Sequence, residues 1–194
     1  MLITIWLVLS GNTAQAQHKF SGWIFQPPAN WHADISKEDV VMVPLDLEPK
    51  EVEAGEAVGI VLYPGKNLKQ PFQEWFDQEV MRVKAKAAVI EEAAVVAAET
   101  EQGISTLSQR LVLRYPDDKQ LHRVLWAVQL GKRVEYLMFV TTSQELYQRY
   151  RGVLEGFLRT VCFVKHPCPE DVPWHGSKRQ WLPRQRKSEC WPSE

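Results

Sequence analysis

Three consecutive segments, 104–115, 121–130 and 133–141, alternate apolar and polar side chains with a period of two. Such alternation indicates β-strands, since successive side chains of a strand point to opposite faces. A Pro-Asp-Asp sequence separates the first two segments and a Gly-Lys pair separates the last two. Connections this short join antiparallel neighbours, so we expect a long antiparallel meander. One face of the middle strand should carry His122, Val124, Trp126, Val128 and Leu130, and one face of the last strand should carry Val134, Tyr136, Met138 and Val140.

Segment 70–84 follows a helical period instead. Its large apolar residues recur at steps of three and four positions, which places them on one face of a helix. Pro71 suits the first turn, where its missing N–H has no intrahelical partner. We therefore predict an amphipathic helix. Its apolar residues are Phe72, Phe76, Val80 and Val83, with Trp75 beside them.

A second amphipathic helix is predicted over 142–159. It begins with a capping box, in which the Thr142 hydroxyl accepts from the Glu145 N–H and the Glu145 carboxylate reaches back. One apolar stripe then follows the helix, so both predicted helices should cover the sheet, either one on each face or both on one face. The stripe consists of Leu146, Tyr150, Val153, Leu154, Phe157, Leu158 and Val161.

The remaining segments are shorter. Apolar runs at 23–26, 40–43 and 57–63 each stop at a proline, which ends a strand because it cannot donate to the ladder. The acidic segment 46–55 is predicted as a loop or wide hairpin. Segment 85–98 mixes helix and strand formers, and we expect a helix end followed by a strand from about Ala93. The fold class is therefore α+β, an antiparallel meander covered by two amphipathic helices.

The order of these motifs resembles that of PsbP-like domains. Residues 22–31 (GWIFQPPANW) form an aromatic strand, a proline break and a tryptophan, and a strand ending in Pro64-Gly65 follows. The resemblance covers about 20–164 and extends to DcrB-like bacterial envelope proteins. It implies an α/β sandwich that binds another protein and has no shared catalytic centre. Its other residues are Phe72, Trp75 and Phe76 of the first helix and Tyr147, Tyr150, Phe157 and Phe163 near the end.

Residues 1–16 resemble a secretory signal peptide. Residues 2–9 are apolar, and Ala14-Gln15-Ala16 forms a small-residue cleavage site before Gln17. The run is too short to span a membrane; a buried N-terminal strand is the alternative. Asn12 stands where a lipobox requires cysteine, so no lipid anchor is expected. The mature chain is then exported to the periplasm or the cell exterior and soluble, with a PsbP-like domain at 17–164 and a tail at 165–194.

The tail 165–194 contains five prolines and is predicted to be irregular. Tryptophan among basic residues suits an anionic surface, which makes peripheral membrane contact one interpretation. The other interpretation is that the tryptophans pack back on the domain. The residues concerned are Trp174, Lys178, Arg179, Trp181, Arg184, Arg186 and Lys187.

The three cysteines are Cys162, Cys168 and Cys190. Export permits a disulfide, and we favour Cys168–Cys190 with Cys162 as a buried thiol; Cys162–Cys168 and three free thiols are the alternatives. The cysteine and histidine spacing matches no standard zinc site, and 46–56 lacks the ligand spacing of a calcium loop. No metal or cofactor is expected.

No nucleophile elbow, phosphate loop or metalloprotease motif occurs, so we do not expect an enzyme. His122 is interpreted as a structural histidine. The net charge of −1 argues against a nucleic-acid partner. The leading hypothesis is an exported protein that binds another protein of the cell envelope through its sheet face or its loops. The alternative is a carrier of a small ligand or lipid, with a pocket between sheet and helix lined by Trp75, Trp126, Tyr136 and Phe157.

Overall fold

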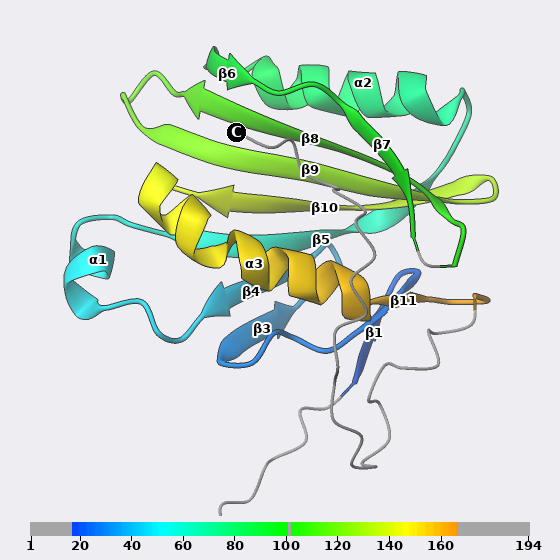
Figure 1. Cartoon of the computed structure of the whole chain (residues 1–194), viewed down its shortest axis with the longest axis horizontal. Helices are drawn as coiled ribbons and strands as arrows, with labels where there is room; N and C mark the ends of the chain where they lie inside the picture. Colours follow the sequence, from blue (N-terminus) through cyan, green and yellow to red (C-terminus); the bar gives the residue numbers. More distant parts are fainter. Residues whose placement is uncertain (1–16, 101, 167–194) are drawn as a thin grey trace, which may run out of the picture.

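The structure is a computed structural model that describes residues 17–100 and 102–166. This part of the chain forms two antiparallel sheets and three helices (Figure 1). The large sheet has the order β3 (Trp31–Ile35), β4 (Val40–Pro44), β5 (Val58–Asn67), β10 (Arg133–Thr141), β9 (Gln120–Leu130), β8 (Ser105–Arg114) and β6 (Ala88–Glu92), and β7 (Val96–Glu99) also pairs with β8. The small sheet has the order β1 (His18–Phe20), β2 (Trp23–Phe25) and β11 (Cys162–Phe163). The helices are α1 (Pro49–Glu53), α2 (Phe72–Lys84) and α3 (Gln144–Thr160).

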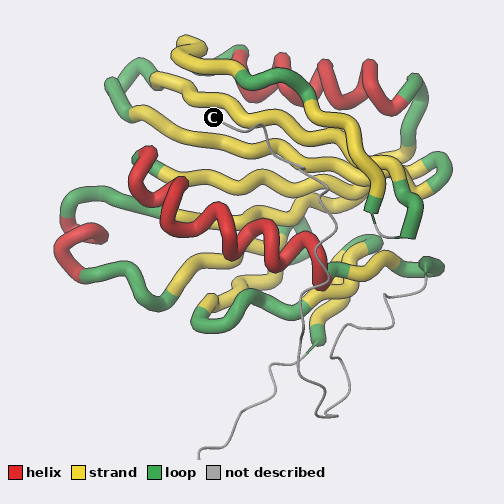
Figure 2. The backbone as a smooth tube through the Cα atoms, in the orientation of Figure 1, coloured by secondary structure: helices red, strands yellow, loops and turns green. Residues whose placement is uncertain are grey.

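Helices α2 and α3 lie on opposite faces of the large sheet (Figure 2). On β10, Leu137 and Phe139 belong to the core beneath α3, whereas Tyr136 and Met138 belong to the core beneath α2. The alternation read from the sequence therefore separates two cores rather than a core from solvent. The α+β class and the antiparallel meander are confirmed, with three helices in the described residues where two were expected.

The acidic segment predicted as a loop contains helix α1, and that prediction was wrong. Pro49 occupies the first turn, and Glu48 and Glu51 form a reciprocal capping box across it. The Glu48 N–H donates to Glu51 Oε2 at 2.9 Å. A capping box satisfies two N–H groups that a short helix otherwise leaves without partners, so one helical turn forms despite the charge of the segment.

The second error concerns the segment between α2 and β8. Strand β6 begins at Ala88, ahead of the predicted start at Ala93, and a break separates it from β7. Both strands pair antiparallel with β8, with a register irregularity between Val89 and Glu91. Pairing with a long neighbouring strand thus overrides the helix preference of the alanines and glutamates.

The predicted cap of α3 is displaced by one residue. Ser143 is the N-cap, and its hydroxyl accepts from the Leu146 N–H at 3.3 Å. Thr142 instead joins α3 to the start of β5: its hydroxyl accepts from the Ala57 N–H at 2.8 Å and donates to Glu56 at 2.5 Å. The threonine is therefore used for a tertiary contact rather than for the helix end.

The small sheet was not predicted as a unit. Trp23 is fully buried, and its ring lies 5.3 Å from that of Phe163 and 6.0 Å from that of Trp126. The C-terminal end of α3 leads directly into β11, so the small sheet lies beside that end of the helix (Figure 1). Among residues 17–100 and 102–166, no helix is both long and apolar enough to cross a membrane.

Candidate functional site

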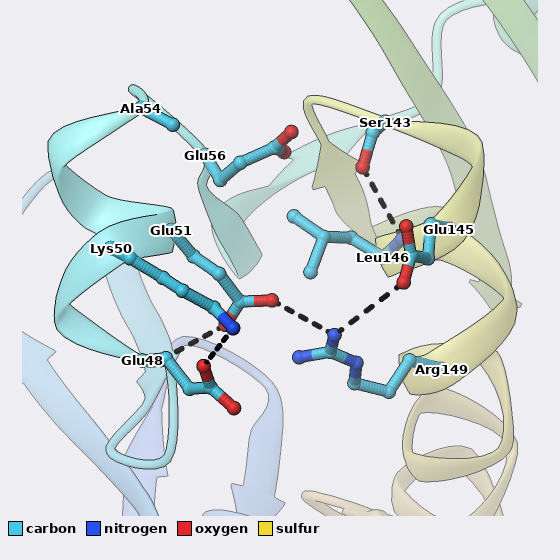
Figure 3. Close-up of a pocket in the computed structure, with 9 residues that line it drawn as sticks. All are labelled: Glu48, Lys50, Glu51, Ala54, Glu56, Ser143, Glu145, Leu146 and Arg149. Carbon is cyan, nitrogen blue, oxygen red and sulfur yellow. Dashed lines mark hydrogen bonds and ion pairs between the residues drawn. The ribbon is translucent and has the colours of Figure 1, made fainter.

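A polar notch lies between α1 and the N-terminal half of α3 (Figure 3). Its volume is about 360 Å³, and it is open to solvent. Four glutamate side chains and two cationic side chains line the notch, so its acidic groups outnumber its basic groups by two. The lining residues are Glu48, Lys50, Glu51, Ala54, Glu56, Ser143, Glu145, Leu146 and Arg149.

The inner wall of the notch is held by one ion pair between the two helices. Arg149 Nη2 of α3 lies 2.8 Å from Glu51 Oε1 of α1, and the Glu51 side chain is 15% exposed. Because the other oxygen of Glu51 accepts from the Glu48 N–H, the same carboxylate caps α1 and docks it. Figure 3 shows Glu51 and Arg149 pointing toward each other across the notch.

The outer wall carries side chains that project toward solvent. Glu145 lies 4.0 Å from Arg149, but its side chain is 86% exposed, and Glu48 binds Lys50 at 2.7 Å with both side chains more than half exposed. Such exposed pairs contribute little to stability. These carboxylates are therefore available to a binding partner.

Hydrogen bonds set the ionisation of the inner wall. The Arg149 guanidinium, followed by the Glu48 N–H, lowers the pKa of Glu51 from its ordinary value. Glu51 in turn raises the pKa of Arg149, and the side chain of Glu48 raises the pKa of Lys50. At neutral pH Glu51 is thus negatively charged and Lys50 and Arg149 are positively charged, each cation being tied to a specific carboxylate.

Two exposed apolar side chains lie in the segment that forms the notch. Leu45 precedes α1 and is 71% exposed, and Val52 on α1 is 58% exposed. We call the notch residues together with Leu45 and Val52 the acidic surface.

The sequence signal for this site was incomplete. The sequence shows the acidic run of 46–56 and the Glu48-x-x-Glu51 spacing. It does not indicate that Arg149 belongs to the same site, because almost the whole meander separates Arg149 from Glu51 in the sequence. No cluster of three or more histidine, cysteine or acidic side chains that could hold a metal ion occurs in the described part of the chain.

The structure divides the four residues predicted to line a ligand pocket into two pairs. Trp75 and Tyr136 contact each other beneath α2, with ring centroids 5.3 Å apart. Trp126 and Phe157 lie in the core beneath α3. Since the sheet separates the pairs, they do not surround one pocket, and a binding role for any of them stays a prediction.

His122 is 3% exposed, and its ring stacks on Tyr147 with centroids 6.1 Å apart. Burial, followed by the charge of Arg110, lowers the pKa of His122, so the ring is neutral at pH 7. This environment fits the structural role proposed for His122.

The predicted signal peptide (1–16) lies outside the described residues. Cys162 is fully buried on β11 and is disulfide-bonded, so the prediction that it is a buried thiol was wrong. Cys168 and Cys190 lie outside the described residues, so the identity of its partner stays a prediction. The same applies to the anionic-surface residues of the tail. These residues are Trp174, Lys178, Arg179, Trp181, Arg184, Arg186 and Lys187.

The ion pair between Arg149 and Glu51 makes the docking of α1 sensitive to acid. Because the pKa of Glu51 is lowered in the fold, its contribution is present above the unfolded pKa of about 4.3 and is lost as pH falls through the folded value. We expect α1 amides to lose protection from hydrogen exchange below about pH 4. Glu51→Gln should lose this protection already at neutral pH, whereas Glu53→Gln on the same helix should behave as wild type. An α1 that remains equally protected in Glu51→Gln would contradict the assignment.

No protein-family model matches the chain, and no curated protein matches it in sequence. Solved structures do match. LpqN of Mycobacterium tuberculosis, a protein involved in cell envelope biogenesis, has a TM-score of 0.54 at 10% identity, covering 81% of this chain and 88% of LpqN. The PsbP of the cyanobacterium Synechocystis has a TM-score of 0.49 at 12% identity, covering 79% and 95%. The Ran-binding protein Mog1p of Saccharomyces cerevisiae has a TM-score of 0.49 at 10% identity, covering 78% and 97%.

At these identities the likeness concerns the fold and not the activity, and the superposition on LpqN is the one that supports it. The resemblance inferred from the aromatic and proline motifs is thereby confirmed. The chain shares its fold with LpqN, in agreement with the PsbP-like fold expected from those motifs.

Proposed function

We propose that this chain is a non-enzymatic, exported PsbP-like domain that binds another protein through the acidic surface. The observation that carries the proposal is the construction of this surface: an inner ion pair holds α1 against α3, while carboxylates and apolar side chains project outward. A surface fixed before binding loses less conformational freedom when a partner docks. Export is supported by the signal-like sequence of 1–16.

The chemistry of the acidic surface defines the partner. Glu48 and Glu145 present negative charge at the rim, and Leu45 and Val52 present apolar area. Complementary charge accelerates association and excludes acidic partners, whereas apolar contacts supply affinity. We infer a protein partner of the cell envelope that offers lysine or arginine side chains around an apolar residue.

The carrier alternative receives less support. Trp126 and Phe157 are 6% and 3% exposed and pack within the core. Trp75 and Tyr136 are 8% exposed and pack against each other. Side chains packed in this way fill the space that a ligand would occupy.

Site-specific crosslinking tests the proposal. A photoreactive amino acid replaces Glu145 in the full chain, expressed in its own organism, and a matched chain carries it at Glu74, which is exposed on α2 at the opposite face. We expect one defined protein adduct from position 145 and none from position 74. Equal adducts from both positions, or from neither, would contradict binding through the acidic surface.

Charge removal supplies the second measurement. Glu48→Gln with Glu145→Gln should lower partner recovery about fivefold at low salt, since each rim charge contributes about 0.5 kcal/mol. The control, Glu74→Gln with Glu99→Gln, removes two exposed charges elsewhere and should leave recovery unchanged. Turnover of a substrate by the purified chain in an activity screen would overturn the non-enzymatic part of the proposal.

A further inference from the structure

A polar network joins the turn between β1 and β2 to the large sheet. The Ser21 hydroxyl accepts from the Gly65 N–H of β5 at 2.8 Å and from Arg133 Nη2 of β10 at 2.6 Å. It donates to Glu135 Oε1 at 3.4 Å, and Arg133 Nε lies 2.7 Å from the same oxygen. Ser21 has a positive φ of 55°, so the turn adopts an uncommon backbone conformation to reach this network.

Glu135 is the buried member of the network. It is fully buried, and its second oxygen, Oε2, has no hydrogen-bond partner among the described residues. Two glycines give it space: a Cβ at Gly22 would lie 2.8 Å from Glu135 Cδ, and one at Gly65 would lie 2.5 Å from the same atom. A carboxylate oxygen without a partner in a dry environment is costly while the group is charged.

The charges around Glu135 are few. Arg133, on the same strand, lies against it, and its side chain is 44% exposed. The β1–β2 turn and β5 contribute the neutral Ser21, Gly22 and Gly65, and the residue paired with Glu135 on β9 is Val128. Lys66, which follows Gly65, binds Glu79 of α2 at 2.8 Å on the other face of the sheet.

We propose that Glu135 is a pH-sensitive latch, which holds the β1–β2 turn against the large sheet more firmly in mild acid than at neutral pH. When the turn opens, water reaches the carboxylate and hydrates its charge. Protonation of the buried carboxyl removes the charge, so opening of the turn no longer gains the free energy of hydrating that charge. Because Trp23 follows the turn directly and is fully buried, opening exposes part of the aromatic core.

The direction follows from linkage. Burial raises the pKa of Glu135 above its ordinary value, against the opposing effects of Arg133, Ser21 and the Gly22 backbone N–H. A raised pKa in the closed state means that the contribution of Glu135 to closure is fully present below its ordinary pKa and is lost as pH rises through the raised value. Each unit by which the pKa is raised changes the opening equilibrium about tenfold.

Hydrogen exchange of the amides of 18–25, corrected for the intrinsic effect of pH on exchange, measures this opening. In the wild-type chain we expect the opening equilibrium constant to increase as the pH rises above the ordinary glutamate pKa of about 4.3, about tenfold for each unit of raised pKa. In Glu135→Gln, which cannot ionise, it should be independent of pH. The control Glu79→Gln, at a mostly buried carboxylate on α2, should keep the wild-type dependence.

A wild-type chain with opening independent of pH, or a pH dependence that persists in Glu135→Gln, would overturn the latch. If Glu135→Gln does not fold, the ¹³C chemical shift of the Glu135 carboxyl in the wild-type chain, followed as a function of pH, tests the latch instead. A titration midpoint above the ordinary glutamate value of about 4.3 supports the latch, and a midpoint at or below it overturns the latch.

Discussion

Replacing Phe76 with alanine should lower the free energy of unfolding by about 3–5 kcal/mol. Phe76 is fully buried on α2 and belongs to the core formed with β8, β9 and β10. The substitution removes the apolar contact and leaves a cavity that the sheet, paired on both sides, cannot close. Urea denaturation followed by circular dichroism measures the loss as a lower midpoint with an unchanged slope.

Phe72 provides the matched control for Phe76. It lies four residues earlier on the same helix and is only partly buried against the same core. The chemical change is the same at both positions, so the comparison mainly reports the difference in burial. Phe72→Ala should cost no more than about 2 kcal/mol. Equal losses for the two variants would show that the core beneath α2 is not packed as described.

Gly65→Ala should cost about 3 kcal/mol, although it adds one methyl group. The new Cβ would lie 2.6 Å from Arg133 Nε and 2.5 Å from Glu135 Cδ, so the buried carboxylate or its cation must move. Moving either one separates the fully buried Glu135 carboxylate from the half-exposed Arg133, which adds to the cost of the overlap. Thermal or urea unfolding measures the change.

Two further variants separate the overlap from a general effect of alanine at glycine positions. Gly152 lies within α3, and a Cβ there meets no atom within 4 Å, so Gly152→Ala should stabilise by about 0.5–1 kcal/mol. Glu135→Ala should relieve the overlap, which makes the double variant Gly65→Ala with Glu135→Ala more stable than the sum of the single changes. Additive losses would show that Gly65 and Glu135 do not share this space.

The elements that the sequence predicts best are those with a long local pattern. The strand 133–141 has the predicted bounds, and the predicted helix starting at Gln70 begins two residues later, at Phe72. In both segments many side chains repeat one period. The alternation along 133–141 correctly predicts which residues share a face of β10, although both faces are buried. Each face carries its own set of apolar residues, and each set belongs to a different core.

Prediction failed where tertiary contacts decide the local structure. Strand β6 forms because β8 is long enough to pair with it, and nothing in the alanine- and glutamate-rich sequence of 85–98 contains that information. The acidic surface was not predicted as a site for the same reason. Its acidic residues were apparent, but Arg149, which docks α1, is separated from Glu51 by most of the sheet.

The arrangement of the small sheet determines how this domain can be connected to other chains. Strands β1 and β11 both flank β2, so the first and last described strands are separated by two strand spacings, about 10 Å. Because β1 and β11 run parallel, a flexible linker from Phe163 to His18 has to cross this gap and also return along the three residues of β1. A circular permutant that joins these ends and opens the chain at the β9–β10 turn, beside Gly131, would keep every strand pair of the meander except its hairpin connection.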